Sequence, residues 1–146
     1  MSRIACETTI DAPPERCFDL SRSVELHLEA ARATGERAVD GVTSGLLGAG
    51  DTVTWEARHL GRRRQLTVRI AAYERPRFFR DEQVRGPFRR MVHDHVFEPA
   101  DGGTRMRDVF EFASGFALLD WLVLAPHLRR FLLRRNELIR RTAERR

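Results

Sequence analysis

Polar and apolar residues alternate through the first ten positions and again through the middle of the chain. Such alternation predicts strands that bury one face. The predicted strands cover residues 3–10, 36–39, 51–60, 66–70, 78–84, 88–97 and 104–112. Turn residues connect the later strands, as in Arg75-Pro76 and Asp101-Gly102-Gly103. Because these connections are short, we expect the strands from residue 51 onward to form an antiparallel meander.

Helix signals follow the first strand. Residues 11–15 offer a polar cap, two prolines suited to a first helical turn and an acid, which predicts a short helix to about Leu20. A second short helix follows Ser23 and stops at Gly35. The glycine-rich loop 41–50 leads into a predicted strand, whereas phosphate-binding loops lead into a helix, so nucleotide binding is not indicated.

After Gly115 the apolar residues recur at helical spacing, which predicts a long C-terminal helix. Its apolar face collects Trp121, Leu124, Leu128, Phe131, Leu132, Leu138 and Ile139. Pro126 lacks the backbone N–H that a helix interior needs, so we expect a kink or a short break near Ala125.

This order of elements predicts an α+β helix-grip fold. In such a fold a curved antiparallel sheet, here of about six or seven strands, wraps around a long C-terminal helix, with two short helices after the first strand. A chain of 146 residues has the usual size of one domain, so we expect a single domain over residues 1–146. A sheet that curls around one helix leaves a hollow between them, which predicts a small-molecule cavity.

Composition excludes several kinds of chemistry. All 26 basic residues are arginine, so Schiff-base catalysis, pyridoxal phosphate attachment and a phosphate-binding P-loop lysine are excluded, and we expect no cofactor. Residues 1–10 lack the apolar run of a signal peptide, and no stretch approaches the roughly 20 apolar residues of a membrane span. We therefore expect a cytoplasmic protein, in which Cys6 and Cys17 are small buried hydrophobes.

The terminal helix is strongly basic, since residues 127–146 contain eight arginines and two glutamates. Nucleic-acid motifs are missing, so we interpret this charge as a solvated helix face and expect no nucleic-acid partner. Residues 118–124 followed by Arg129, Arg130, Arg134 and Arg135 also resemble an interfacial segment, which would allow transient membrane contact. We favour the core-facing helix, because the core needs the apolar stripe. The chain is expected to be a monomer or a homodimer.

Two histidines form the most suggestive pattern in the chain. His93 and His95 are two residues apart on one predicted strand, so both should point to the inner face. The same alternation places Asp108 inward on the next strand, within reach of a histidine. The other inward residues of these two strands are Met91, Phe97, Met106, Phe110 and Phe112.

On the strand before the histidines, we place Phe79, Asp81 and Gln83 inward. A strict two-residue turn at Gly86-Pro87 would shift the register by one and pair Arg80 and Glu82 with the histidines instead. Both registers remain open at this point.

A polar cluster on an apolar wall has three interpretations. The polar groups can satisfy one another and define the sheet register. They can orient the polar end of a ligand whose apolar body lies along Trp55, Met91, Met106, Phe110 and the helix. They can also catalyse, with a histidine and Asp81 or Asp108 as a general acid–base pair. Metal binding has suitable ligand types but no helical His-x-x-x-His spacing, so no metal is expected.

Four motifs resemble the ligand-binding branch of the START-like, Bet v 1-like (SRPBCC) superfamily, which also contains polyketide cyclases and lipid-transfer domains. They are Ile-Asp-Ala-Pro-Pro-Glu at 10–15, Asp-Glu-Gln-Val-Arg-Gly-Pro-Phe at 81–88, His-Asp-His-Val-Phe-Glu at 93–98, and Gly-Gly-Thr at 102–104 leading to Asp108. One departure is Met91, which stands where the subfamily pattern has an aromatic residue. The resemblance implies a helix-grip fold with an internal cavity for a hydrophobic or amphipathic molecule.

Our leading hypothesis is therefore binding or transfer of a lipid-like or aromatic small molecule. The expected ligand-binding residues are Trp55, Phe79, Gln83, Met91, His93, His95, Phe97, Met106, Phe110, Trp121, Leu124 and Leu128. The alternative is a small cyclase, dehydratase or hydratase that uses His93, His95, Asp81 and Asp108.

Overall fold

A seven-stranded antiparallel sheet forms one layer of the computed structural model, which describes residues 1–59 and 62–145. The strand order is β1-β7-β6-β5-β4-β3-β2. Consecutive strands from β3 to β7 are neighbours, as the short connections predict, and β2 pairs with β3 across a longer loop. The strands are β1 (Ser2–Ile10), β2 (Arg37–Gly41), β3 (Thr52–His59), β4 (Arg62–Glu74), β5 (Phe78–Arg85), β6 (Arg90–Ala100) and β7 (Gly103–Ala113). The strand expected over 51–60 is confirmed as far as His59, and Leu60 lies outside the described residues.

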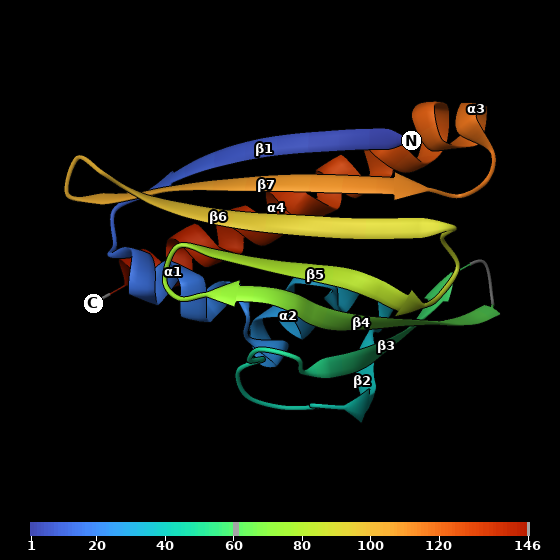
Figure 1. Cartoon of the computed structure of the whole chain (residues 1–146), viewed down its shortest axis with the longest axis horizontal. Helices are drawn as coiled ribbons and strands as arrows, with labels where there is room; N and C mark the ends of the chain where they lie inside the picture. The colour runs from blue at the N-terminus through green and yellow to red at the C-terminus, as the bar shows by residue number, and fades with distance from the viewer. Residues whose placement is uncertain (60–61, 146) are drawn as a thin grey trace.

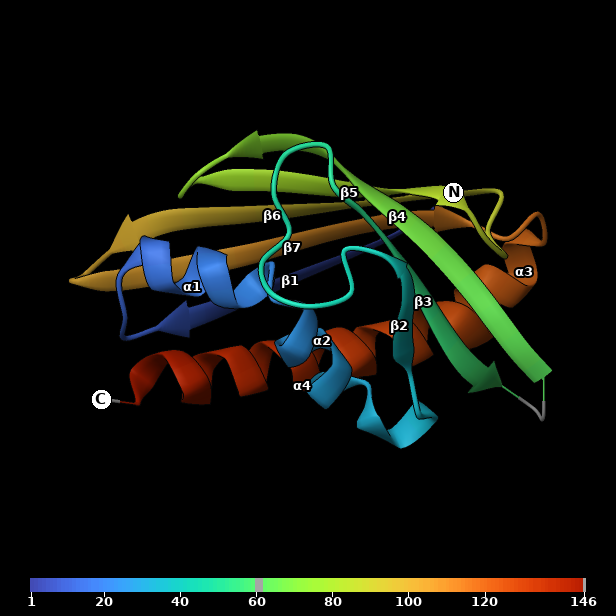
Figure 2. The ribbon, with the colours of Figure 1, turned by 90° about the horizontal axis from the view of Figure 1, so that it is seen from below.

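Helices form the second layer and cover one face of the sheet (Figure 1 and Figure 2). They are α1 (Pro14–Ser21), α2 (Val24–Ala30), the 3₁₀ turn η1 (Arg32–Thr34), α3 (Ala117–Leu119), the π-helical turn η2 (Asp120–Leu124) and α4 (Ala125–Glu144). Helix α1 and the start of α2 lie where the sequence predicts, but α2 ends at Ala30, and the separate turn η1 occupies the rest of the segment that was expected to be helical up to Gly35. The Ser23 hydroxyl accepts a hydrogen bond from the Leu26 amide, and Gly35 ends η1 with a left-handed φ of 63°. The helix-grip fold is therefore confirmed.

The core lies between the sheet and α4. Alternate residues of β1, β6 and β7 are buried, and α4 contributes Leu132, Ile139 and Ala143. Phe18 of α1 packs edge-on against Tyr73, Phe79 and Phe97, so α1 closes the end of the core near the C-terminus (Figure 1). Cys6 and Cys17 are free and buried, as expected.

The start of the C-terminal helix departs from a regular α-helix. Pro126 cannot donate a hydrogen bond to the preceding turn, and the chain widens into the π-helical turn η2 just before it. The irregularity expected near Ala125 is thus present as a π-helical turn. Trp121 lies within this turn, where the α-helical repeat is interrupted, and it is 70% exposed, while Leu124 and Leu128 are half-buried. The prediction that Trp121 faces inward was wrong.

Candidate functional site

The sheet register brings the predicted polar residues together. Asp81 lies opposite His93 and Phe79 lies opposite His95, while Asp108 lies opposite His95 on the other side. The inward placement of Phe79 and Asp81 is therefore confirmed. The connection from β5 to β6 spans residues 86–89 and is not a two-residue turn, so Arg80 instead forms an ion pair with Asp94 on the other face.

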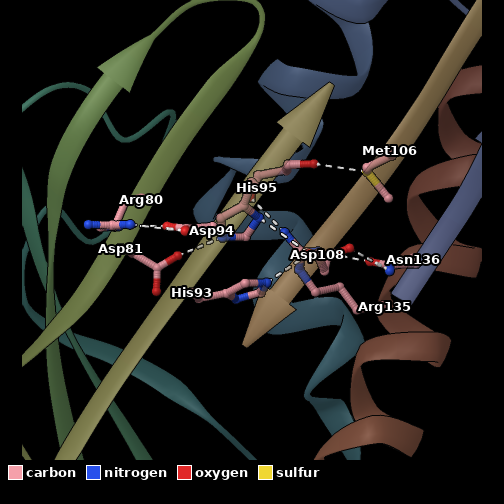
Figure 3. A network of polar contacts seen from close by, with 10 residues as sticks. Arg80, Asp81, His93, Asp94, His95, Met106, Asp108, Arg135 and Asn136 are labelled. Carbon is pink, nitrogen blue, oxygen red and sulfur yellow. Dashed lines mark hydrogen bonds and ion pairs between the residues drawn. The ribbon is translucent and has the colours of Figure 1, made fainter. Parts of the chain in front are cut away.

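Six residues form a connected polar cluster on the face that α4 covers (Figure 3). They are Asp81, His93, His95, Asp108, Arg135 and Asn136. The Nε2 atoms of the two histidines lie 2.7 Å from carboxylate oxygens, His93 from Asp108 and His95 from Asp81. These contacts link the middle strands of the sheet through side chains as well as through the backbone.

Helix α4 joins the polar cluster through two adjacent residues. Asn136 donates from Nδ2 to Oδ2 of Asp108 over 2.8 Å, and its Oδ1 accepts a hydrogen bond from Arg135. The other end of the Arg135 guanidinium donates to the Ser21 carbonyl oxygen at the end of α1. The cluster therefore ties α4 and α1 to the sheet.

Sequence reasoning missed both α4 members of the polar cluster. Arg135 was counted with the solvated arginines, yet it is buried. Asn136 stands at helical spacing between the buried residues Leu132 and Ile139. A single amide side chain on an apolar helix face could have indicated that Asn136 is part of a polar site, because buried polar groups need hydrogen-bond partners.

Aromatic stacking orders the two histidines. Their rings lie 3.7 Å apart between centroids at 29°, and the Phe79 ring stacks on His95 at 4.0 Å and 11°. Together with the hydrogen bonds, this stack restrains both ring planes.

Charge in the polar cluster is unevenly distributed. Burial opposes ionisation of Asp108, but the hydrogen bond from His93 and the charges of His93 and Arg135 outweigh it and hold the Asp108 pKa far below its usual range. The pKa of Asp81 is lowered in the same way, since the contact with His95 outweighs burial. Burial, followed by repulsion from His93, lowers the pKa of His95 to about 4. At neutral pH both carboxylates are ionised and His95 is neutral.

Access to solvent separates Asp81 from the rest of the polar cluster. Its side chain is 17% exposed, whereas His93, His95, Asp108, Arg135 and Asn136 are buried. Within the described residues, no buried side-chain nitrogen or oxygen lacks a hydrogen-bond partner. The cluster can thus satisfy itself and stabilise the fold, and Asp81 is where an outside molecule would meet it.

Three members of the polar cluster could also hold a metal ion. Ligand atoms of Asp81, His93 and His95 lie within 4.8 Å of one another. A metal would have to displace the existing hydrogen bonds to the histidines, and it would lie near the cationic Arg135. The observed geometry is that of a hydrogen-bonded network.

The other predicted ligand-binding residues fall into three groups. Those whose side chains are buried in the core are Trp55, Phe79, Met91, Phe97, Met106 and Phe110. Gln83, Leu124 and Leu128 are half-buried, and Trp121 is exposed. The Gln83 amide binds both backbone groups of Phe88, so it stabilises the turn before β6. Trp55 stacks on His27 of α2 at 3.9 Å, a contact that the sequence did not predict.

Two hollows lie on the outer side of α4. One has a volume of about 520 Å³ and is lined by residues of α2, η1 and α4, among them Glu29, Arg32 and Leu133. The other, of about 490 Å³, is lined by His127, Arg130, Leu133 and Arg134. Neither lies between the sheet and α4, where the sequence predicts a cavity, and buried side chains form a continuous cluster there.

Comparisons with known proteins agree with this architecture. Residues 1–144 match the family described as polyketide cyclase / dehydrase and lipid transport. A comparison with curated proteins gave no match. None of the described helices has the length and apolar content needed to cross a membrane.

Solved structures share the fold at low sequence identity. TTHA0849 from Thermus thermophilus has a TM-score of 0.73 and 20% identity, covering 98% of this chain and 100% of that protein. The major latex-like protein 151 from Panax ginseng has a TM-score of 0.71 and 14% identity, covering 99% and 98%. CV1439 from Chromobacterium violaceum has a TM-score of 0.72 and 13% identity, covering 99% and 98%. From the family match over nearly its whole length, the chain belongs to the polyketide cyclase/dehydrase and lipid transport family, within the Bet v 1-like SRPBCC group.

Proposed function

We propose that this protein binds a hydrophobic or amphipathic small molecule between the sheet and the first two turns of α4. The observation that carries the proposal is the uneven burial of α4. Its buried residues are Leu132, Arg135, Asn136, Ile139 and Ala143, and none lies in the segment 125–131. This front segment of α4 covers the sheet incompletely.

One polar side chain on the covered face of the sheet remains partly accessible to solvent. Asp81 lies on the face of the sheet that α4 covers, because its partner His95 belongs to the same polar cluster as Asn136 of α4. The Asp81 side chain is nevertheless 17% exposed. Several apolar side chains around the core are also only half-buried. Those of interest here are Leu66 and Phe88 from the sheet side and Leu124, Leu128 and Phe131 from the helix side. We infer that these five residues surround the ligand entrance, and we call them the apolar mouth.

A ligand in the apolar mouth would gain free energy by removing apolar surface from water. The core includes Met91 on the side of the polar cluster away from α1, and its flexible side chain adapts to different shapes. The polar end of the ligand would meet the Asp81 carboxylate. Its Oδ2 is hydrogen-bonded to His95, and no side-chain hydrogen bond to its Oδ1 is observed within residues 1–59 and 62–145. A hydroxyl or amine group suits this carboxylate.

Entry requires movement, because buried side chains form a continuous cluster between the sheet and α4, and the two hollows described above lie elsewhere. Hydrogen bonds from Arg135 and Asn136 hold the middle of α4. The front segment 125–131 lies before these anchors and follows the π-helical turn, where the helical hydrogen-bond pattern already changes. We infer that this segment shifts away from the sheet to admit the ligand.

Two measurements on the whole protein test this function. Native mass spectrometry of freshly purified protein should show a bound small molecule, and the neutral apolar dye N-phenyl-1-naphthylamine should bind saturably. Leu128→Trp should fill the apolar mouth and abolish dye binding. Leu133→Trp, on the outer side of the same helix, should leave it unchanged. Absence of both a bound molecule and saturable dye binding would overturn the proposal, as would equal loss in the two variants.

A second candidate function is a cyclase, dehydratase or hydratase. One observation favours it: Asp81 is both accessible and hydrogen-bonded to His95, an arrangement suited to general acid–base catalysis. Incubation of the molecule found by mass spectrometry with excess protein separates the two functions. A product that differs in mass or in chromatographic retention time, formed by the native protein and not by Asp81→Asn, indicates an enzyme, because cyclisation can change the retention time without changing the mass. An unchanged mass and retention time with both proteins indicate a carrier.

A further inference from the structure

Eight consecutive residues at the start of the C-terminal helix form an exposed apolar segment, defined here as residues 116–123. Its large apolar side chains are between 43% and 70% exposed, and they are Phe116, Leu118, Leu119, Trp121, Leu122 and Val123. Soluble proteins rarely leave so many large apolar side chains together in water, and such patches mark interaction sites. The core therefore does not account for this stretch of sequence.

The apolar segment is held in a defined position. The Asp120 side chain is buried, and both of its carboxylate oxygens accept a hydrogen bond from the Ser114 amide, at 3.2 and 3.0 Å. Helix α3 and the π-helical turn η2 pack mainly against each other and against α4. They lie beside the N-terminus, beyond the end of β7 (Figure 1). The segment is thus a fixed apolar projection from one end of the molecule.

Exposed arginines lie on two sides of the apolar segment. Arg90 pairs with Ala113 in the β6–β7 ladder, and the Arg89 amide donates to the Ala113 carbonyl oxygen, so both lie next to the chain that leads into the segment. Arg129 and Arg130 are exposed on α4 within about two turns after it. The only acid between residues 112 and 136 is the buried Asp120, and none occurs in 84–92.

We propose that this end of the protein docks on the surface of an anionic lipid bilayer. The apolar segment enters the interface between headgroups and acyl chains, and Arg89, Arg90, Arg129 and Arg130 contact the negative headgroups. Trp121 has the amphipathic ring that favours this depth. The docking surface goes beyond the ligand-binding proposal and does not depend on it.

The positive charge around the apolar segment favours an anionic bilayer over a second copy of the chain as its partner. In a two-fold dimer through the apolar segment, the four arginines of one copy would lie close to those of the other, and residues 84–92 and 121–136 offer no acid to separate them. Such like charges repel across a partly desolvated interface. An anionic bilayer supplies an apolar layer and negative charge together.

The tryptophans provide a site-specific assay. The chain contains two, so Trp55→Phe leaves Trp121 as the single reporter. Vesicles of phosphatidylcholine with phosphatidylglycerol should shift its emission to the blue and should co-sediment with the protein, whereas pure phosphatidylcholine vesicles should bind far less. Raising the salt concentration should weaken binding, because the charge contribution is screened.

Matched variants separate the apolar and the charged contributions. Leu118→Ser with Leu122→Ser should abolish the shift, while Leu46→Ser, another exposed leucine in the loop before β3, should not. Arg129→Gln with Arg130→Gln should weaken binding about fivefold per arginine. Arg77→Gln with Arg105→Gln, at the opposite end of the sheet, should leave it unchanged. Circular dichroism verifies that each variant is folded.

Three results would overturn the proposal. The first is failure of the native protein to bind the phosphatidylglycerol vesicles at low salt. The second is equal binding to neutral and anionic vesicles. The third is a dimer that forms without lipid and dissociates into monomers in the double variant Leu118→Ser, Leu122→Ser. Analytical ultracentrifugation detects the last of these.

Discussion

Asp108→Asn isolates what the polar cluster contributes to folding. The Asp108 carboxylate accepts hydrogen bonds from His93 and Asn136 and lies 3.6 Å from a guanidinium nitrogen of Arg135. A neutral amide of the same shape would leave a buried cation without its anion. Removing one partner of a buried ion pair costs about 3–5 kcal/mol. For a chain of this length, that cost lowers Tm by roughly 6–20 °C.

Urea unfolding measures this effect, with the buried Trp55 as reporter in a Trp121→Phe background. The matched control is Asp94→Asn, which makes the same change in the neighbouring strand but on the opposite face of the sheet. Asp94 pairs with Arg80, and their side chains are 24% and 43% exposed, so the control should cost less than about 1 kcal/mol. Equal losses of unfolding free energy in the two variants would refute the stabilising role of the polar cluster.

The exchange of Asp108→Asn with Asn136→Asp gives a second check. It returns a carboxylate to the same pair of positions, beside Arg135, but from the helix side. The double variant should recover most of the stability lost by Asp108→Asn. If the double variant instead loses the sum of the unfolding free energies that the two single variants lose, the two residues do not act together.

Three other predictions concern separate parts of the structure. Because the folded pKa of His95 lies near 4 and its ordinary value is 6.5, the unfolded chain binds the proton more readily, so unfolding free energy should fall as pH decreases from 6.5 toward 4. The lowered pKa values of Asp81 and Asp108 should extend this loss to lower pH. Urea unfolding of the native protein and of His95→Gln at a series of pH values measures the effect. If unfolding free energy depends on pH equally in both proteins, His95 is not the cause. Trp121→Ser should change unfolding free energy by less than about 0.5 kcal/mol, and a large loss would place this residue in the core. Ser23→Ala removes the cap of α2 and should cost about 1 kcal/mol by the same assay, whereas no change would show that the cap is dispensable.

The sequence predicted the elements that follow simple periodicity. One-sided burial produces alternation in a strand, so the inward set around His93 and His95 could be found before the structure was known. The register of β5 was harder, because it depends on the four residues that connect it to β6, and turn length is not evident from Gly86-Pro87 alone.

The terminal helix shows where periodicity fails. Trp121 fits the apolar repeat only if the helix is regular, and the π-helical turn before Pro126 breaks that repeat. Arg135 looks like a surface residue because arginines usually are, and only its contacts with Ser21 and Asn136 explain its burial. The contact with Ser21 joins residues that are far apart in sequence, so no local pattern reveals it.

Methyl NMR with added N-phenyl-1-naphthylamine tests the central claim most directly, because it distinguishes the inner side of α4 from the outer side. Binding between the sheet and the front segment of α4 predicts saturable shifts at the methyl groups of Leu66, Leu124 and Leu128, with no shift at Leu133. Shifts confined to Leu133 and the outer hollows, or no saturable shift at all, would contradict the proposed binding site.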